Sequence, residues 1–126
     1  MLFGDGAGAV VLTPADEPGV IATHLHSDGK YKDLLYSPYG VSSGFETLRN
    51  NSTDGLKMSG NEVFKVAVRT LSRLVDETLA KNGIERGDID WLIPHQANLR
   101  IIQSAADKLG LPMEKVVVTV QDHGNT

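Results

Sequence analysis

The residues of this sequence best suited to chemistry are a histidine and an asparagine that follow two short apolar runs. His95 comes after Trp91–Ile93 and Pro94, and Asn125 comes after Val116–Val120. Each side chain offers a neutral N–H donor, and two donors directed at one oxygen form an oxyanion hole. Ligands of open α/β sheets bind just outside the carboxyl ends of the strands. We therefore predict that His95 and Asn125 act together on one reacting oxygen.

Both residues also have an ordinary structural interpretation. A lone histidine before a helix often caps it or packs against it. The pair Gly124-Asn125 is common turn chemistry, because both residues tolerate a left-handed backbone. Their position after two neighbouring strands of one sheet favours a site over these separate structural roles.

Two helices are predicted to help position the pair. Apolar residues recur at helical spacing over residues 60–82, after the capping-box sequence Ser59–Glu62 and before the helix-ending Gly83. A second helix is predicted over residues 97–109, where Gly110 stops it.

Short apolar segments around these helices predict strands, and a polar stretch without periodicity separates the first two strands from the first helix. The predicted strands are residues 7–12, 19–26, 90–93 and 116–120, with two shorter candidates at 34–36 and 56–58. The resulting order is β-β-loop-α-β-α-β. Alternating strands and helices predict an α/β fold with a parallel sheet, covering helices and right-handed crossovers.

Composition excludes several classes of function. The chain has 126 residues, a hydrophobic content of 40% and a net charge of −4, with no basic block, so we expect no nucleic-acid partner. No apolar run approaches the roughly 18 residues of a membrane span and no signal peptide opens the chain, so we expect a cytoplasmic protein without membrane association. The absence of cysteine excludes disulfides and a cysteine nucleophile among these residues.

Two other patterns lack the context that their sites require. The sequence Gly4–Ala9 fits the dinucleotide pattern G-x-G-x-x-A, but strand residues 10–12 and then Pro14 follow it, so no helix N-terminus is available for a pyrophosphate. His24 and His26 lie two positions apart without a third ligand at suitable spacing. We predict that the chain binds neither a dinucleotide nor a metal.

Four strings of residues resemble those of the β-ketoacyl-acyl-carrier-protein synthase III family, the condensing enzymes that start bacterial fatty-acid synthesis. They are Leu2–Ala9, Met58–Lys65, Pro94–Arg100 and His123–Thr126, in the family's order. The resemblance covers nearly the whole chain, although residues 28–56 carry it poorly. It implies a thiolase fold of two similar halves. Residues 1–12 would be the last strand of the first half and residues 19–126 the start of the second, so the chain would be an incomplete thiolase-like half.

The resemblance also implies a catalytic set of Cys, His and Asn. His95 and Asn125 match the histidine and asparagine, whereas the cysteine would lie before residue 1. The implied reaction condenses an acyl-CoA primer with malonyl-acyl carrier protein, releases CO2 and yields 3-oxoacyl-acyl carrier protein through an acyl-Cys thioester. His95 and Asn125 would donate hydrogen bonds to the enolate oxygen formed on decarboxylation. Without the cysteine, we expect this chain alone to be inactive.

Further contacts are implied by the same resemblance. The pantetheine arm would contact Gly60, Phe64, Ala97 and Asn98. The acyl carrier protein would contact Lys65, Gln96, Ala97, Asn98, Leu99, Arg100 and Lys108. Phe64 suits core packing equally well, and the basic residues suit a solvated helix face equally well. Acyl-CoA and acyl carrier protein are the implied partners, with a homodimer in the full enzyme and no cofactor.

The same residues fit two other functions. One is a related Cys-His-Asn condensing enzyme of secondary metabolism that takes a different acyl donor. The other is a non-catalytic fragment that only binds carrier protein or assembles with the missing halves. Residues of the acyl pocket, and a cysteine encoded upstream in a strand-to-helix turn, would discriminate among the three.

Overall fold

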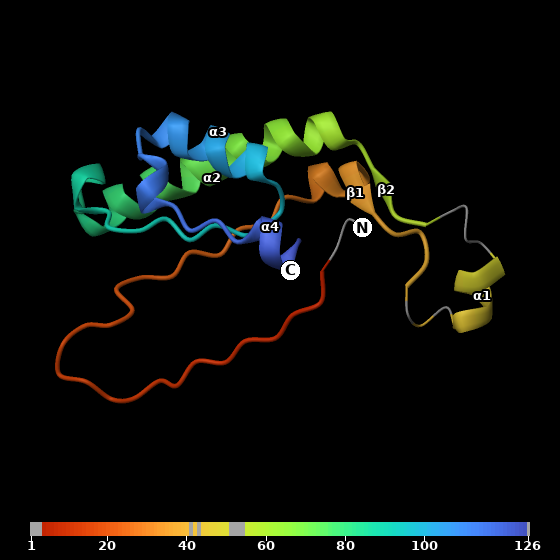
Figure 1. Ribbon diagram of the computed structural model, residues 1–126, viewed down its shortest axis with the longest axis horizontal. Helices are drawn as coiled ribbons and strands as arrows, with labels where there is room; N and C mark the ends of the chain where they lie inside the picture. Colours follow the sequence, from red (N-terminus) through yellow and green to blue (C-terminus); the bar gives the residue numbers. More distant parts are fainter. Residues whose placement is uncertain (1–3, 41, 43, 51–54, 126) are drawn as a thin grey trace. The chain divides into compact units, whose positions relative to one another are not determined.

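The computed structural model describes residues 4–40, 42, 44–50 and 55–125 (Figure 1). The chain forms two units, one of Met1–His24 with Ala67–Thr126 and the other of Leu25–Val66. In chain order the elements are η1 (Gly29–Leu34), β1 (Leu35–Tyr36), α1 (Phe45–Asn50), β2 (Lys57–Met58), α2 (Gly60–Asn82), η4 (Arg86–Asp88), α3 (Leu99–Leu109), η5 (Met113–Lys115) and α4 (Val120–His123). No helix of this described part has the length and apolarity required to cross a membrane.

Helix α2 has the bounds predicted from the sequence. The Ser59 carbonyl accepts the N–H of Glu62 at 3.0 Å, which begins the helix. Gly83 follows the last turn with a φ of +64°, a left-handed conformation that glycine adopts without steric cost. The N–H of Ile84 then donates to the Leu79 carbonyl at 3.1 Å, which is the bond of a Schellman helix end.

Helix α3 begins two residues later than predicted because Asn98 is its N-cap. The Asn98 backbone is extended, and its side chain accepts the N–H of Arg100 at 2.8 Å. Gly110 ends the helix with a φ of +70° and donates its N–H to the carbonyls of Ala106 and Asp107. The buried residues of α3 are Ile101, Ile102, Ala105, Ala106 and Leu109.

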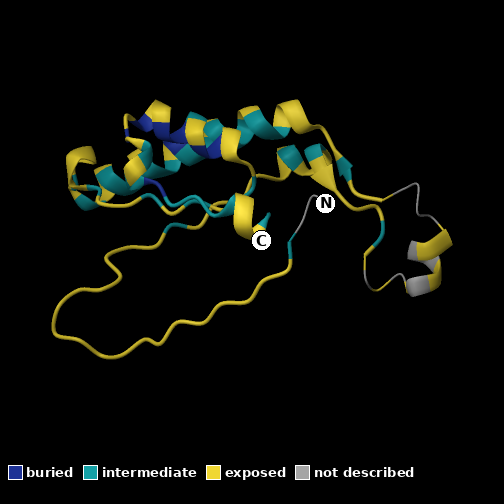
Figure 2. Ribbon diagram, viewed as in Figure 1, coloured by how far each residue is buried: buried dark blue, intermediate teal, exposed yellow. Residues whose placement is uncertain are grey.

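The core of the first unit lies under α3. Ile102 and Ala106 are both 0% exposed and form a cluster with Val116. Three partly buried side chains pack against this cluster, those of Leu92, Met113 and Val118. Figure 2 shows the buried residues gathered along α3. The apolar face of α3 thus covers two backbone segments, residues 91–93 and 116–118.

These two segments pair in the parallel sense that the sequence predicts, but at one position. Leu92 and Val116 form an isolated parallel bridge. The Leu92 N–H donates to the Lys115 carbonyl at 2.8 Å, and the Val117 N–H donates to the Leu92 carbonyl at 2.9 Å. The predicted strand over residues 116–120 does not form: the pairing is confined to the bridge at Val116, and α4 begins at Val120.

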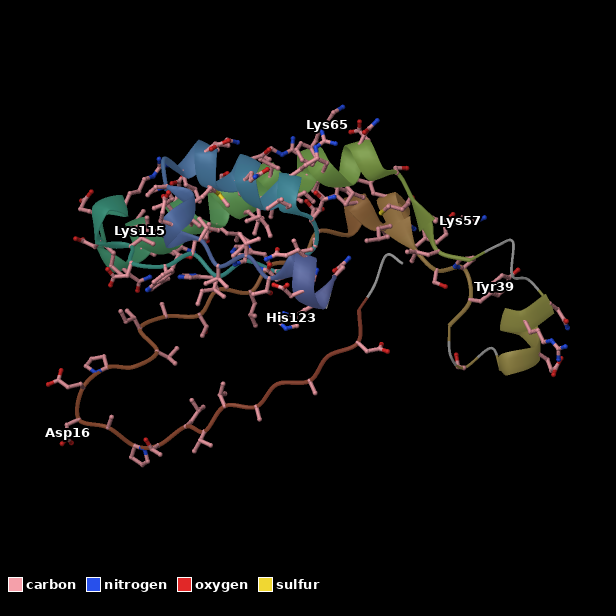
Figure 3. All side chains as sticks on the ribbon, viewed as in Figure 1. Asp16, Tyr39, Lys57, Lys65, Lys115 and His123 are labelled. Carbon is pink, nitrogen blue, oxygen red and sulfur yellow. The ribbon has the colours of Figure 1, made fainter. Side chains whose placement is uncertain are left out.

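Residues 4–24 form an open arm rather than the two predicted strands. The arm bends around Asp16 (Figures 1 and 3), and none of its described residues forms a strand ladder, although the Gly4 N–H donates to the Asn125 carbonyl at 2.9 Å. Val10, Val11 and Leu12 are 82–89% exposed. The strand prediction for residues 7–12 and 19–26 is therefore not met here, because a strand forms only where a partner supplies the hydrogen bonds of its ladder.

The second unit contains the two short strands predicted at residues 34–36 and 56–58. Strands β1 and β2 pair antiparallel, with Leu35 opposite Met58 and Tyr36 opposite Lys57. The Ser59 N–H donates to the Leu34 carbonyl at 2.8 Å, which ties the start of α2 to this pair. Helix α1 lies within the stretch that the sequence predicts as loop.

Candidate functional site

Proline interrupts the parallel pairing at the carboxyl ends of the two segments. After the Leu92 bridge, the next bond of a parallel ladder would run from the N–H of residue 94 to the Val117 carbonyl. Pro94 has no N–H to donate. The Gln96 side chain supplies the donor instead, because its Nε2 lies 3.1 Å from the Val117 oxygen.

The same amide makes two further bonds across the ends of the segments. Gln96 Nε2 donates to the Pro94 carbonyl at 2.9 Å, and Gln96 Oε1 accepts the N–H of Thr119 at 2.7 Å. A regular ladder would pair the Thr119 N–H directly with the Pro94 carbonyl, so the glutamine amide stands between them as an additional peptide-like group. Sequence reasoning missed this role. The available signal is a proline that removes a ladder donor two positions before a glutamine.

His95 lies between Pro94, whose carbonyl accepts a bond from this amide, and Gln96, which carries the amide. Its side chain is exposed, whereas Gln96 is half-buried. The His95 carbonyl accepts the N–H of Ala97 at 3.0 Å, so the backbone is bonded on both sides of the imidazole. This arrangement presents the ring to solvent from a fixed stretch of chain.

Asn125 follows the other segment after one helical turn. The Thr119 carbonyl accepts the N–H of His123 at 2.9 Å and so begins α4. Gly124 then has a φ of +69° and a ψ of −159°, a backbone region that is essentially confined to glycine. Asn125 is half-buried, and its carbonyl accepts the N–H of Gly4 at 2.9 Å. The glycine thus sets the direction in which the chain reaches Asn125.

An open pocket lies next to this turn. Asp5, Gly6, Ala7 and Gly8 line it together with His123, whose side chain is labelled in Figure 3. The sequence singles out His123 only as part of a motif. Part of the glycine-rich run Gly4–Ala9, for which the sequence predicts no dinucleotide, borders this open space.

Three predicted substrate and carrier residues lie in the second unit, at the start of α2. A Cβ placed on Gly60 would meet only the Met58 Cε, at 3.9 Å, so packing does not demand a glycine there. Phe64 is half-buried. Lys65 is exposed and forms an ion pair with Glu62 at 2.7 Å, an exposed pair worth at most about 1 kcal/mol.

The other predicted contacts lie in the first unit, around the start of α3. Ala97 is half-buried, and Asn98 is exposed while its Oδ1 caps the helix. Leu99, Arg100 and Lys108 are exposed on α3. Gln96 differs from these neighbours, because its side-chain amide is bonded to the backbone of this chain.

Within the described residues, no group of three or more His, Asp or Glu side chains could hold a metal ion. The Nε2 of His24 is buried without a hydrogen-bond partner.

Comparisons with known proteins bear on both ends of the chain. Residues 79–126 match the family described as 3-oxoacyl-[acyl-carrier-protein] synthase III C terminal, and residues 1–29 match 3-oxoacyl-[acyl-carrier-protein] synthase III. A β-ketoacyl-[acyl-carrier-protein] synthase III of Alkalilimnicola ehrlichii is 64% identical over all 126 residues, which correspond to 39% of that protein. A β-ketoacyl-[acyl-carrier-protein] synthase III of Methylococcus capsulatus is 60% identical over all 126 residues, which correspond to 38% of that protein. The chain thus spans about two fifths of the curated relatives that it matches.

Solved structures agree with the sequence relatives. The crystal structure of 3-oxoacyl-(acyl carrier protein) synthase III from Pseudomonas aeruginosa superposes with a TM-score of 0.74 at 36% identity, covering 91% of this chain and 33% of that one. The chain therefore has an α/β, thiolase-like fold, of the class formed by the condensing enzymes. It belongs to the 3-oxoacyl-acyl-carrier-protein synthase III family.

Proposed function

We propose that this chain supplies the histidine and asparagine of a cysteine-dependent condensing enzyme. The full-length protein would join an acyl-CoA primer to malonyl-acyl carrier protein and release CO2, which begins fatty-acid synthesis. One observation carries the proposal beyond family membership. His95 and Asn125 follow the two segments that are joined by the parallel bridge between Leu92 and Val116. The Gln96 side chain forms hydrogen bonds that hold the ends of these segments together.

The proposed chemistry proceeds in two stages. A cysteine thiolate outside this chain attacks the acyl-CoA carbonyl, and CoA leaves as its thiolate, so that the cysteine carries the acyl group. The malonyl thioester then loses CO2, and the electron pair of the broken C–C bond passes to the α-carbon and the thioester oxygen. The carbanion attacks the acyl-Cys carbonyl, the C–S bond breaks, and the 3-oxoacyl product remains on the carrier protein.

His95 and Asn125 would act in the second stage. The imidazole N–H and the amide N–H would donate to the enolate oxygen as its negative charge develops. Donors that are positioned in advance stabilise the transition state more than the ground state, because the charge appears only along the reaction path. The bonded backbone around His95 and the glycine-determined turn before Asn125 support this prepositioning.

The substrate contacts form a second part of the proposal. Gly60 and Phe64 of α2, with Ala97 and Asn98, would receive the pantetheine arm. Asn98 uses its Oδ1 as a helix cap, so its amide N–H groups would face the ligand. The open space at Gly60 supports close approach of a ligand to the backbone.

The carrier protein, an acidic partner, would contact the exposed basic residues. Lys65, Arg100 and Lys108 supply the positive charge, with Leu99 as an exposed apolar contact of 42% exposure. Such charges mainly raise the rate of encounter and make it depend on salt. The exposed Asp107 interrupts the basic set and would weaken docking locally. The full-length enzyme would be a homodimer in the cytoplasm without a resident cofactor.

The test separates the two stages in the full-length protein. His95→Ala and Asn125→Ala should each lower malonyl decarboxylation by about 10²–10³-fold. Acyl transfer to the cysteine, followed by mass spectrometry of the acylated protein, should stay within about twofold of wild type, because neither donor acts in that stage. His26→Ala, an exposed histidine outside the site, is the matched control and should change neither stage.

Three outcomes would overturn the proposal. Loss of acyl transfer with retained decarboxylation would reverse the assigned roles. Condensation catalysed by the 126-residue chain alone would eliminate the cysteine-dependent mechanism, since this chain contains no cysteine. Carrier-protein binding by a full-length protein that performs neither stage would favour the non-catalytic alternative.

A further inference from the structure

The Gln96 amide connects the backbone beside His95 to the backbone that leads to Asn125. On one side, its Nε2 donates to the Pro94 carbonyl, one residue before the imidazole. On the other side, its Oε1 accepts the N–H of Thr119. Val117 and Thr119 lie 21 and 23 positions from Gln96 in the sequence, so the bonds to them are tertiary, whereas the bond to Pro94 is local.

The connection continues from Thr119 to Asn125 through a series of backbone bonds. The Thr119 carbonyl accepts the N–H groups of Asp122 and His123, at 3.0 and 2.9 Å. The Gly124 N–H donates to the Val120 carbonyl at 2.9 Å, and Asn125 follows directly. A displacement of Thr119 would therefore move α4 and the residue after it.

The glutamine also has no good substitute at this position. Its amide offers two donors and an acceptor, and all three partners are backbone groups. One of them, the Val117 carbonyl, has no ladder donor because Pro94 lacks an N–H. A hydrophobic side chain of equal length would leave those partners without the bonds that Gln96 makes. A glutamate would present only acceptors to the Pro94 and Val117 carbonyls.

We infer that Gln96 is a positioning residue, whose amide replaces the ladder bond lost at Pro94 and so sets the relative placement of His95 and Asn125. This inference rests on the proposed function, because it assigns Gln96 to the decarboxylation stage. It gives Gln96 a role that differs from the carrier-protein contact implied by the family resemblance. Gln96 itself does not touch the reacting atoms.

The experiment compares Gln96→Glu and Gln96→Met with Gln103→Glu in the full-length protein. Gln103 is an exposed glutamine of α3, so its variant carries the same charge change outside the site. Both Gln96 variants should lower the kcat of malonyl decarboxylation by about 10²-fold, the order expected when a reacting group is misplaced by about 1 Å. Acyl transfer to the cysteine should stay within about twofold for each folded molecule. The control should change neither stage.

A structural role alone makes a different prediction. If Gln96 had only a structural role, its loss would lower the rates of both stages in proportion to the folded fraction, which urea unfolding of each variant measures. An equal fall of both stages, or unchanged decarboxylation in Gln96→Met, would overturn the inference. A readout without catalysis follows the Thr119 amide by hydrogen exchange: its protection should fall in Gln96→Met and persist in Gln96→Glu, where one acceptor oxygen remains.

The His95→Ala variant distinguishes failure of this inference from failure of the proposed function. If His95→Ala abolishes decarboxylation and the Gln96 variants do not affect it, only the positioning role is wrong. If His95→Ala leaves decarboxylation intact, the proposed function is wrong, and the assignment of Gln96 fails with it.

Discussion

Truncation of Ile102 should remove the largest single contribution to the core of the first unit. Ile102 is 0% exposed and packs with Ala106 and Val116 under α3. Ile102→Ala removes three buried carbons, and their transfer to water costs about 2.4 kcal/mol at about 0.8 kcal/mol each. The cavity that remains adds to this cost, so we expect the free energy of unfolding to fall by about 2–5 kcal/mol. Ile102→Val removes one carbon and should cost about 0.5–1.5 kcal/mol.

Urea unfolding of the 126-residue chain, followed by far-ultraviolet circular dichroism, measures these differences. The matched control is Gln103→Ala, one position along α3, because Gln103 is exposed and its loss should change stability by no more than about 0.5 kcal/mol. The ratio of the two Ile102 effects tests the packing directly. If Ile102→Ala cost no more than Gln103→Ala, the core under α3 would not exist in solution, and the strand ends that carry His95 would lack their support.

Three further predictions concern helix ends and charge. Gly110→Ala should destabilise the chain by about 1–2 kcal/mol because residue 110 has a φ of +70°, whereas Gly87→Ala should be nearly neutral; thermal unfolding distinguishes them. Asn98→Ala should cost about 1 kcal/mol of stability and Asn98→Asp much less, because only aspartate keeps the N-cap acceptor. Equal free energies of unfolding for the two variants, measured in urea, would contradict this prediction. A hydrogen bond to the Asp28 carboxylate, with a further contribution from the neighbouring tyrosine, raises the pKa of Lys30 above its ordinary value of 10.5. The stabilisation linked to Lys30 should therefore be present below that value and disappear as the pH rises through the raised pKa. An NMR titration should show a lower Lys30 pKa in Asp28→Asn.

The helices could be predicted from the sequence because their signals are local. Apolar spacing and a terminal glycine identify α2 with its observed bounds and the end of α3 at Gly110. The start of α3 differs by two residues, since Asn98 suits both the helix and its cap and only the extended backbone decides between them. Local periodicity cannot supply that distinction.

The strands and the Gln96 contacts depend on partners that sequence patterns do not identify. Residues 7–12 have the composition of a buried strand, yet pairing determines whether they form one, and they pair with no described segment. The Gln96 amide bonds to residues 21 and 23 positions away. Its role becomes visible only when the interrupted ladder at Pro94 is seen together with Val117. The joint action of His95 and Asn125 stays a prediction.

The open arm has a consequence for this chain at high concentration. Residues 7–13 contain neither a charged residue nor a proline, and their backbone has no ladder partner among the described residues. An exposed segment of this composition is a template for pairing with the same segment of another molecule, which is the first step of cross-β aggregation. Pro14, Asp16 and Glu17 follow it and act as gatekeepers that limit the length of such a contact. Any intermolecular sheet should therefore nucleate in residues 7–13 and stop at Pro14.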